Sequence, residues 1–218
     1  MTAARDAIKR GIGNLYSWSA ERVYEPLVVR GAFPLLGGDL NDLALEQGRR
    51  AVAGAGTRPV LDMPVGTAFF TVSAAAAHEG LVVGADIASG MVQRAQRAGA
   101  EAGLDNLVAV QADAHHLPFA DGSFGAILCT NGLQVIPGLE PALGELARVL
   151  APGALLYASV ITMPVAAALP ARAGRKLPTL LKSRRELIEA LTGAGLAVRA
   201  VRSRRLATLV EALKPVAG

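Results

Sequence analysis

The stretch that decides the fold is VLDMPVGTAFF, from Val60 to Phe70. Val60 and Leu61 predict a buried strand that Asp62 closes, and Gly66 lies in a tight turn before a helix. Ligands of open parallel sheets bind at the carboxyl ends of strands, where a glycine lets the backbone approach them closely. The stretch therefore predicts a site for a nucleoside-bearing cofactor.

The glycine pattern of this turn narrows the choice of cofactor. A dinucleotide fingerprint needs three spaced glycines, so that a pyrophosphate can sit on the helix N-terminus. The comparable positions here are Pro64, Gly66 and Ala68. Proline fixes φ and lacks an N–H, and alanine adds a methyl group. We therefore expect a poor pyrophosphate cradle, with Gly66 as the residue that the site needs most.

Outward from this turn, short apolar runs alternate with helical patterns, which predicts an α/β fold with a parallel sheet covered by helices. The expected strands are 60–62, 81–86, 107–112, 125–129 and 155–161. The expected helices cover 39–52, 68–77, 89–102, the region around Pro141 to Leu150, and a segment that starts near Ser183. Segments 196–201 and 207–213 are joined by a short basic link, so we expect them to form an antiparallel pair.

Two more acidic residues close consecutive predicted strands. Asp86 ends the second strand, and a carboxylate there can accept hydrogen bonds from two ribose hydroxyls. Asp113 ends the third strand and is followed by Ala114, a pair that can meet the amino group and a ring nitrogen of adenine. Taken singly, Asp86 is also explained as a helix N-cap and Asp113 as a turn acid. Acids at three consecutive strand ends are hard to explain by chance.

This order of motifs resembles the class I S-adenosylmethionine-dependent methyltransferases, and most of all the small-molecule subgroup that includes the ubiquinone/menaquinone-biosynthesis enzymes. The matching stretches are VLDMPVGTA, GADIASGMVQRA, QADAHHLPFADGSFGAILCTNGLQVI and LARVLAPGALLYASV. The resemblance implies a Rossmann-like, doubly wound, mostly parallel seven-stranded sheet with an antiparallel last strand and an N-terminal helical lid. It also implies S-adenosyl-L-methionine as the cofactor. Gly125 departs from the family pattern, which usually has aspartate there.

The resemblance assigns roles to individual residues. Asp62 and Gly66 would face the methionine end of the cofactor. Asp86 would hold the ribose, with Ile87 packing on the adenine. Thr130 and Asn131 would border the sulfonium and the substrate. The full cofactor-binding set that it implies is Tyr16, Asp62, Met63, Gly66, Asp86, Ile87, Met91, Asp113, Ala114, Thr130 and Asn131.

Methyl transfer from a sulfonium needs little catalytic apparatus, because positioning supplies much of the rate and a general base helps when the acceptor is a hydroxyl. The candidates for a catalytic role are His115, His116 and Asn131, although the two histidines follow Asp113 and are expected on the adenine side. Neighbouring histidines lack metal-ligand spacing, so no metal is expected. Cys129 is expected to be a small buried hydrophobic residue.

The chain is expected to divide into an N-terminal helical lid or cap, 1–56, and a cofactor-binding core, 57–218, in which 162–182 covers the substrate. The residues expected to line the acceptor pocket are Trp18, Tyr24, Phe33, Gln134 and Met163. An apolar pocket of this kind suits a small quinone, phenolic, polyketide-like or lipid acceptor.

The composition limits the partners. The 218 residues include one cysteine, which suits a reducing cytoplasm, and no apolar run is long enough to span a membrane. The net charge of +4 comes with many late arginines but without interleaved aromatics, so nucleic acid is not favoured as a partner. The alternatives that stay open are a nicotinamide-dependent oxidoreductase, a non-catalytic relative and a nucleic-acid methyltransferase. The sequence does not indicate an oligomeric state.

Overall fold

The structure is a computed structural model that describes residues 40–161, 184–204 and 207–216. Its strands are β1 (Val60–Asp62), β2 (Val82–Asp86), β3 (Leu107–Gln111), β4 (Phe124–Thr130), β5 (Leu150–Ile161), β6 (Ala197–Arg204) and β7 (Ala207–Leu213). Its helices are α3 (Leu40–Ala55), α4 (Phe69–Ala76), α5 (Ser89–Glu101), the short 3₁₀ helix η2 (Leu133–Val135), α6 (Leu139–Val149) and α7 (Arg184–Gly193).

The seven strands form one sheet in the order β3-β2-β1-β4-β5-β7-β6. β1 pairs in parallel with β2 and β4, and β7 runs antiparallel to both β5 and β6. The predicted fold class is confirmed, including the antiparallel last strand. The chain leaves β1 toward β3 on one side and builds β4 and β5 on the other. The carboxyl ends of β1 and β4 therefore flank the switch point at which such sheets bind ligands.

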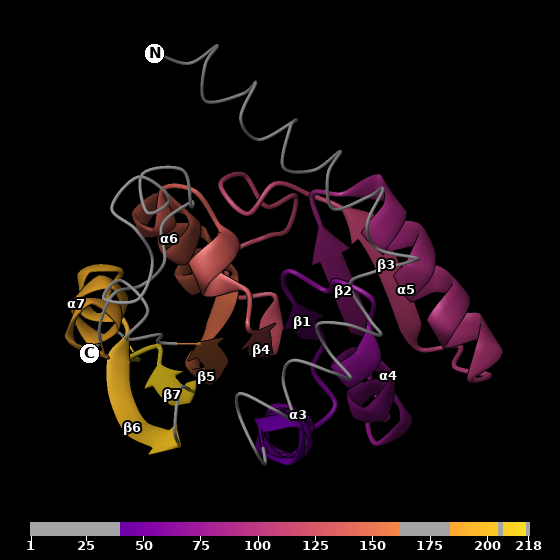
Figure 1. The fold of residues 1–218 in the computed structure, drawn as a ribbon, viewed down its shortest axis with the longest axis horizontal. Helices are drawn as coiled ribbons and strands as arrows, with labels where there is room; N and C mark the ends of the chain where they lie inside the picture. Colours follow the sequence, from indigo (N-terminus) through magenta and orange to yellow (C-terminus); the bar gives the residue numbers. More distant parts are fainter. Residues whose placement is uncertain (1–39, 162–183, 205–206, 217–218) are drawn as a thin grey trace, which may run out of the picture.

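Helices cover both faces of the sheet (Figure 1). α3, α4 and α5 lie on one face, where Val60 and Leu128 pack with Ala51 of α3. α6 and α7 lie on the other, where Leu61 and Ile127 join the larger core cluster. Successive side chains of a strand point to opposite faces, so the apolar residues of β1 and β4 contribute to two cores at once. No described helix is long and apolar enough to cross a membrane.

Predicted and observed boundaries differ mainly at β5, which begins at Leu150 rather than Leu155. Leu150 pairs with Phe124, and the register then shifts before Leu155 pairs with Ala126. The shift breaks the regular strand pattern, so the sequence did not show the early start. α3 forms the last part of the predicted lid and packs on the sheet, while residues 1–39 and 162–183 lie outside the described part.

The structure gives a steric reason for Gly125, the departure noted in the sequence. A Cβ there would lie 2.6 Å from Cβ of Arg58 and 3.1 Å from the carbonyl oxygen of Ala55. The Gly125 N–H also donates to the carbonyl of Pro59 at 2.8 Å. The segment that follows α3 thus runs so close to β4 that an aspartate side chain has no room.

Candidate active site

The acid at the end of β2 is joined to the turn after β1. The Gly66 N–H donates to Oδ2 of Asp86 at 3.0 Å, and the Ala88 N–H donates to Oδ1 at 2.9 Å. Asp86 is buried, which raises its carboxyl pKa, while these backbone donors oppose the rise. Each oxygen accepts one of these bonds and has lone pairs for more. The Asp86 carboxylate can therefore accept further hydrogen bonds from hydroxyl groups.

Asp62, at the end of β1, has an unsatisfied oxygen. The residue is only 2% exposed, and its Oδ2 accepts a hydrogen bond from the Thr71 hydroxyl at 2.5 Å. Its Oδ1 is buried and has no hydrogen-bond partner among the described residues. Burial raises the Asp62 pKa to about 7, against the Thr71 hydrogen bond and with a smaller contribution from the charge of Asp86. Such an atom fits a ligand that brings a positive charge or a donor, as the α-ammonium group of S-adenosylmethionine does.

The turn between β1 and α4 uses its own amides. The Val65 N–H donates to the Ala85 carbonyl at 2.8 Å, and the Ala68 N–H donates to the Val65 carbonyl at 3.0 Å. With the Gly66 N–H on Asp86, these donors are directed at the protein rather than outward. Ala68 has φ 62° and precedes the first residue of α4, so it adds left-handed strain as well as a methyl group. This strain was not predicted.

The segment after β4 lies directly on this turn. A Cβ on Gly132 would overlap the ring of Pro64. Asn131 has φ 53°, and its N–H donates to the carbonyl of Ser159 at 2.9 Å. The Ser159 hydroxyl donates to Asn131 Oδ1 at 3.2 Å, while Asn131 Nδ2 is buried with no partner among the described residues. Within the same described part, Oε1 of Gln134, in η2, is also buried without a partner.

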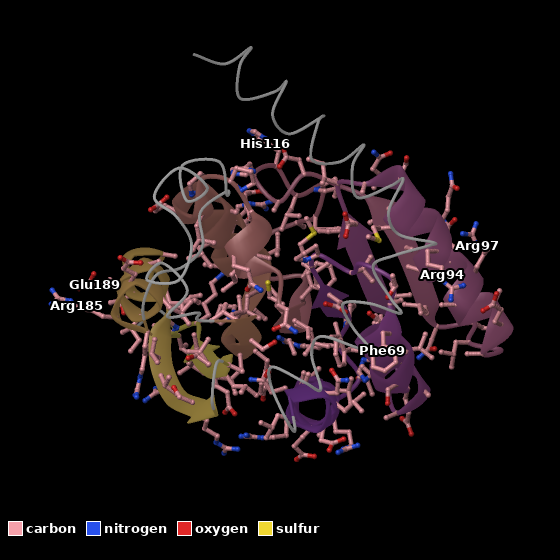
Figure 2. The ribbon with its side chains drawn as sticks, viewed as in Figure 1. Phe69, Arg94, Arg97, His116, Arg185 and Glu189 are labelled. Atoms are coloured by element: carbon pink, nitrogen blue, oxygen red, sulfur yellow. The ribbon has the colours of Figure 1, made fainter. Side chains whose placement is uncertain are left out.

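The two histidines after β3 differ in their surroundings. His115 is buried at 8% exposure, and its ring lies between Asp113 and the carbonyls of Pro137 and Gly138. The His116 side chain is 84% exposed and projects from the body of the molecule (Figure 2). Both histidines lie beside Asp113, as expected from their positions directly after it in the sequence. Within the described residues, no group of three or more His, Cys, Asp or Glu side chains could hold a metal ion.

Of the remaining predicted site residues, Ile87 follows β2 and Thr130 ends β4, and both are partly buried; the others are core residues or lie outside the described part. Met63 and Ala114 belong to the larger core cluster, and Met91 is buried in α5. Cys129 is fully buried and its thiol pKa is raised by that burial, so it fits the predicted small hydrophobic residue. The predicted residues outside the described part are Tyr16, Trp18, Tyr24, Phe33 and Met163.

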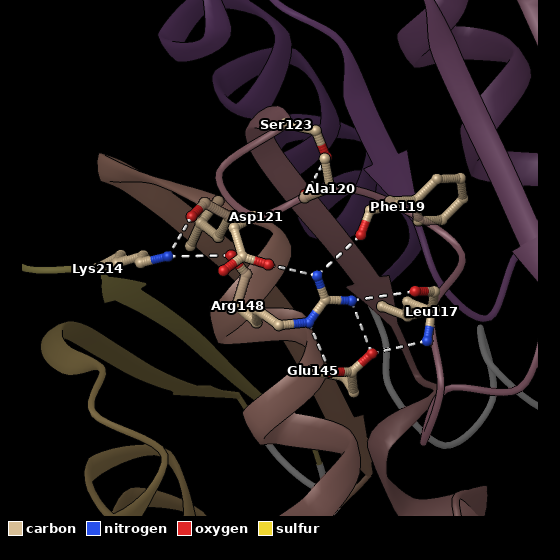
Figure 3. Close-up of polar contacts among 9 residues, drawn as sticks. Leu117, Phe119, Ala120, Asp121, Ser123, Glu145, Arg148 and Lys214 are labelled. Carbon is tan, nitrogen blue, oxygen red and sulfur yellow. Dashed lines mark hydrogen bonds and ion pairs between the residues drawn. The ribbon is translucent and has the colours of Figure 1, made fainter.

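Sequence reasoning missed an arginine that holds the loop after His116. Arg148 of α6 donates to the carbonyls of Phe119 and Leu117 at 2.8 and 3.0 Å and to Oδ1 of Asp121 at 2.6 Å (Figure 3). It also donates to both carboxylate oxygens of Glu145, at 2.7 and 2.8 Å, and Glu145 accepts from the Leu117 N–H. The available signal was the spacing of Glu145 and Arg148, one turn apart on a predicted helix.

Residues 60–153 match the family described as "Methyltransferase domain". This part of the chain is therefore similar to a methyltransferase domain. The matched range contains every described residue of the candidate site, from Asp62 to Gln134. The departures at Pro64, Ala68 and Gly125 therefore lie within a domain that still matches its family.

One similar protein is itself named a methyltransferase. The chain is 38% identical over 138 residues to a demethylmenaquinone methyltransferase of Beutenbergia cavernae, a match that covers 61% of this chain and 55% of the relative. The chain thus spans about half the length of that relative.

Two solved structures show the same fold. A SAM-dependent methyltransferase from Aquifex aeolicus is 21% identical with a TM-score of 0.65, over 84% of this chain and 93% of that one. The [4+2]-cyclase SpnF is 19% identical with a TM-score of 0.70, over 81% of each chain. The chain therefore has the fold of these two proteins.

Proposed function

We propose that the protein transfers a methyl group from S-adenosyl-L-methionine to a small, largely apolar acceptor that carries oxygen. The observation that carries the proposal is the buried, unpartnered Oδ1 of Asp62 beside the Gly66–Asp86 hydrogen bond, at the switch point of the sheet. S-adenosylmethionine supplies a methyl group on a sulfonium, with a neutral thioether as the leaving group. The chain's own task is to hold the two reactants in line.

The cofactor would be held along the carboxyl ends of three strands. Asp62 would pair with the α-ammonium group, and Asp86 would accept the ribose hydroxyls on its remaining lone pairs, with Ile87 against the adenine. Asp113 and the Ala114 N–H would meet the adenine edge. The open space at Gly66, where a Cβ would find no atom of the described residues within 4 Å, supports a ligand lying against that residue.

The acceptor would meet the segment after β4. Asn131 Nδ2 is a donor and Gln134 Oε1 is an acceptor, and both are buried without partners in the described part of the chain. Buried polar atoms are normally paired, so a ligand with its own carbonyl or hydroxyl would satisfy them. This supports a quinone-like or phenolic acceptor over a plain hydrocarbon. The name of the Beutenbergia cavernae relative, a demethylmenaquinone methyltransferase, points the same way.

The nicotinamide alternative is disfavoured by the turn after β1. A pyrophosphate needs backbone N–H groups that face the ligand. The N–H groups of Val65, Gly66 and Ala68 already donate to protein oxygens. A dinucleotide could use these three N–H groups only by breaking those bonds. For the compartment, the single buried thiol of Cys129 supports the reducing cytoplasm that we propose.

The test has two stages. Calorimetric titration of the full chain with S-adenosylmethionine, S-adenosylhomocysteine and NAD should show binding of the first two only. Binding of NAD alone would refute the proposal. The chain is then incubated with methyl-labelled cofactor and matched quinol, phenol, alkene and oligonucleotide acceptors. Label in the quinol or phenol supports the proposal. Cofactor binding without transfer to any acceptor refutes an enzymatic role and favours a non-catalytic relative.

A further inference from the structure

An asparagine and a serine tie the segment after β4 to β5, near the carboxyl end of that strand. The Asn131 N–H donates to the Ser159 carbonyl at 2.9 Å and to the Ser159 hydroxyl oxygen at 3.1 Å. The Ser159 hydroxyl donates in turn to Oδ1 of Asn131 at 3.2 Å. Ser159 is fully buried and Asn131 is only 6% exposed. Water therefore has little access to these hydrogen bonds, and each group depends on the other for a partner.

The Ser159 hydroxyl decides which end of the Asn131 amide turns away from it. A serine hydroxyl has one hydrogen and two lone pairs. Its oxygen accepts from the Asn131 N–H, and its hydrogen finds its acceptor in Oδ1. If the amide were reversed, Nδ2 would face the hydroxyl oxygen, and the hydroxyl hydrogen would lose this acceptor. A buried donor without a partner is costly, so Ser159 favours the orientation with Oδ1 toward it.

The favoured orientation leaves a hydrogen-bond donor for a ligand. Nδ2 of Asn131 is buried and has no partner among the described residues. The backbone of Asn131 has φ 53°, a conformation that asparagine adopts more readily than most residues. The next residue, Gly132, lies so close to the Pro64 ring that a Cβ would overlap it. The free donor therefore belongs to a segment that lies on the turn after β1, where we place the cofactor.

We propose that Ser159 is a positioning residue that makes the acceptor site select an oxygen with a free lone pair. By holding Oδ1, it turns Nδ2 of Asn131 toward the acceptor, where this N–H group binds a ketone or quinone carbonyl or a deprotonated hydroxyl. A molecule without such an oxygen leaves Nδ2 buried and unpaired, and therefore binds less tightly. The inference rests on the proposed function, because it assumes that the acceptor meets the segment after β4.

Ser123→Ala provides a matched control for Ser159→Ala. The Ser123 hydroxyl donates to the carbonyl of Ala120 at 2.8 Å (Figure 3). Ser123 directly precedes β4, so it lies at the other end of that strand from Asn131. The same substitution there removes a hydroxyl-to-carbonyl hydrogen bond and leaves the contacts of the Asn131 amide in place.

The first measurement needs no ligand. The full chain, labelled with carbon-13 and nitrogen-15, is examined by NMR, and the side-chain amide of Asn131 is assigned. A carbonyl carbon resonates downfield when its oxygen accepts a hydrogen bond, so the Asn131 Cγ signal should move upfield in Ser159→Ala and stay in place in Ser123→Ala. An unmoved signal in Ser159→Ala would overturn the proposal. In the wild type, a strong NOE between the Nδ2 protons and the Ser159 β protons would also overturn it, even if the variants fail to fold.

The second measurement compares two bicyclic probes of similar shape in the presence of S-adenosylhomocysteine. α-Tetralone carries a carbonyl group where tetralin has a methylene group. The wild type should bind α-tetralone at least about fivefold more tightly, the size expected for one neutral hydrogen bond. Ser159→Ala should lose most of this preference, because fixing a freed side chain costs about as much as the hydrogen bond gains. Ser123→Ala should keep the wild-type preference.

Asn131→Asp removes the donor itself, because a carboxylate has no hydrogen to donate. This variant should bind α-tetralone no more tightly than tetralin. Equal affinity of the wild type for the two probes, or an undiminished preference in Ser159→Ala, would overturn the inference. Failure of the wild type to bind S-adenosylhomocysteine would instead overturn the proposed function.

Discussion

Replacing Gly66 with valine tests the centre of the proposed cofactor site. Gly66 has φ 54°, where an L-residue costs about 1–2 kcal/mol relative to the right-handed conformation. A Cβ at this position would find no atom of the described residues within 4 Å. The described part of the chain therefore leaves room for a Cβ, and we expect the loss of stability to come mainly from the backbone. The side chain would instead occupy space that we assign to the cofactor.

Gly103 provides a matched control. It has φ 66°, a Cβ there would also find no described atom within 4 Å, and it follows α5 rather than β1. Gly103→Val thus imposes similar backbone strain far along the chain from the candidate site. Any difference between the two variants in ligand binding isolates the steric effect at Gly66.

Both variants are measured by urea unfolding and by calorimetric titration with S-adenosylhomocysteine. Each should lose about 1–2 kcal/mol of unfolding free energy, or slightly more because valine is β-branched. Gly66→Val should also lose at least about tenfold in affinity, equivalent to about 1.4 kcal/mol, while Gly103→Val keeps the wild-type affinity. Equal affinities in the two variants would refute the placement of the cofactor against Gly66.

Three further changes test other parts of the same region. Ala68→Gly should raise the unfolding free energy by up to about 1 kcal/mol in urea, because glycine adopts φ 62° without the strain that alanine carries; a loss of stability would contradict that reason. Asp62→Asn should flatten the fall of stability between pH 4 and 7: the unfolded carboxyl loses its proton near 3.8 and the folded one only at about 7, so wild-type stability decreases as pH rises through this window. Urea unfolding at several pH values checks the slope, and an unchanged slope would mean that Asp62 is not the group responsible. Arg148→Lys should lower the melting temperature and speed hydrogen exchange at the Leu117 N–H, whereas Arg185→Lys, in an exposed pair with Glu189 on α7 (Figure 2), should change neither.

Most of the fold followed from local patterns. Charge-poor runs such as 125–129 predicted central strands, because a parallel strand is buried on both faces. The acids at the ends of β1 and β2 were correctly expected at one edge of the sheet, since parallel neighbours end together. These features depend on residues close in sequence, which is why they could be predicted.

Features that depend on distant residues could not be predicted. The left-handed backbone of Ala68 is imposed by the fold, because alanine has no preference for positive φ. Arg148 binds a loop whose residues lie far from it in sequence, and its position on α6 alone does not name those partners. The link between His115 and the start of α6 is also long-range.

The departures from the family's glycine pattern are accommodated by their neighbours. The Pro64 ring lies where Gly132 has no side chain, so the bulk gained in the first turn is matched by bulk absent after β4. The described hydrogen bonds of the turn do not need an N–H at Pro64, because the N–H groups of Val65 and Gly66 donate to Ala85 and Asp86. It follows that Gly132→Ala should disturb the turn through a clash with the Pro64 ring, although residue 132 is far from Asp62 and Asp86 in the sequence. What distinguishes this turn from a dinucleotide cradle is therefore that the Val65 and Gly66 N–H groups point inward to β2. Gly66 is the position at which a ligand can still approach the backbone.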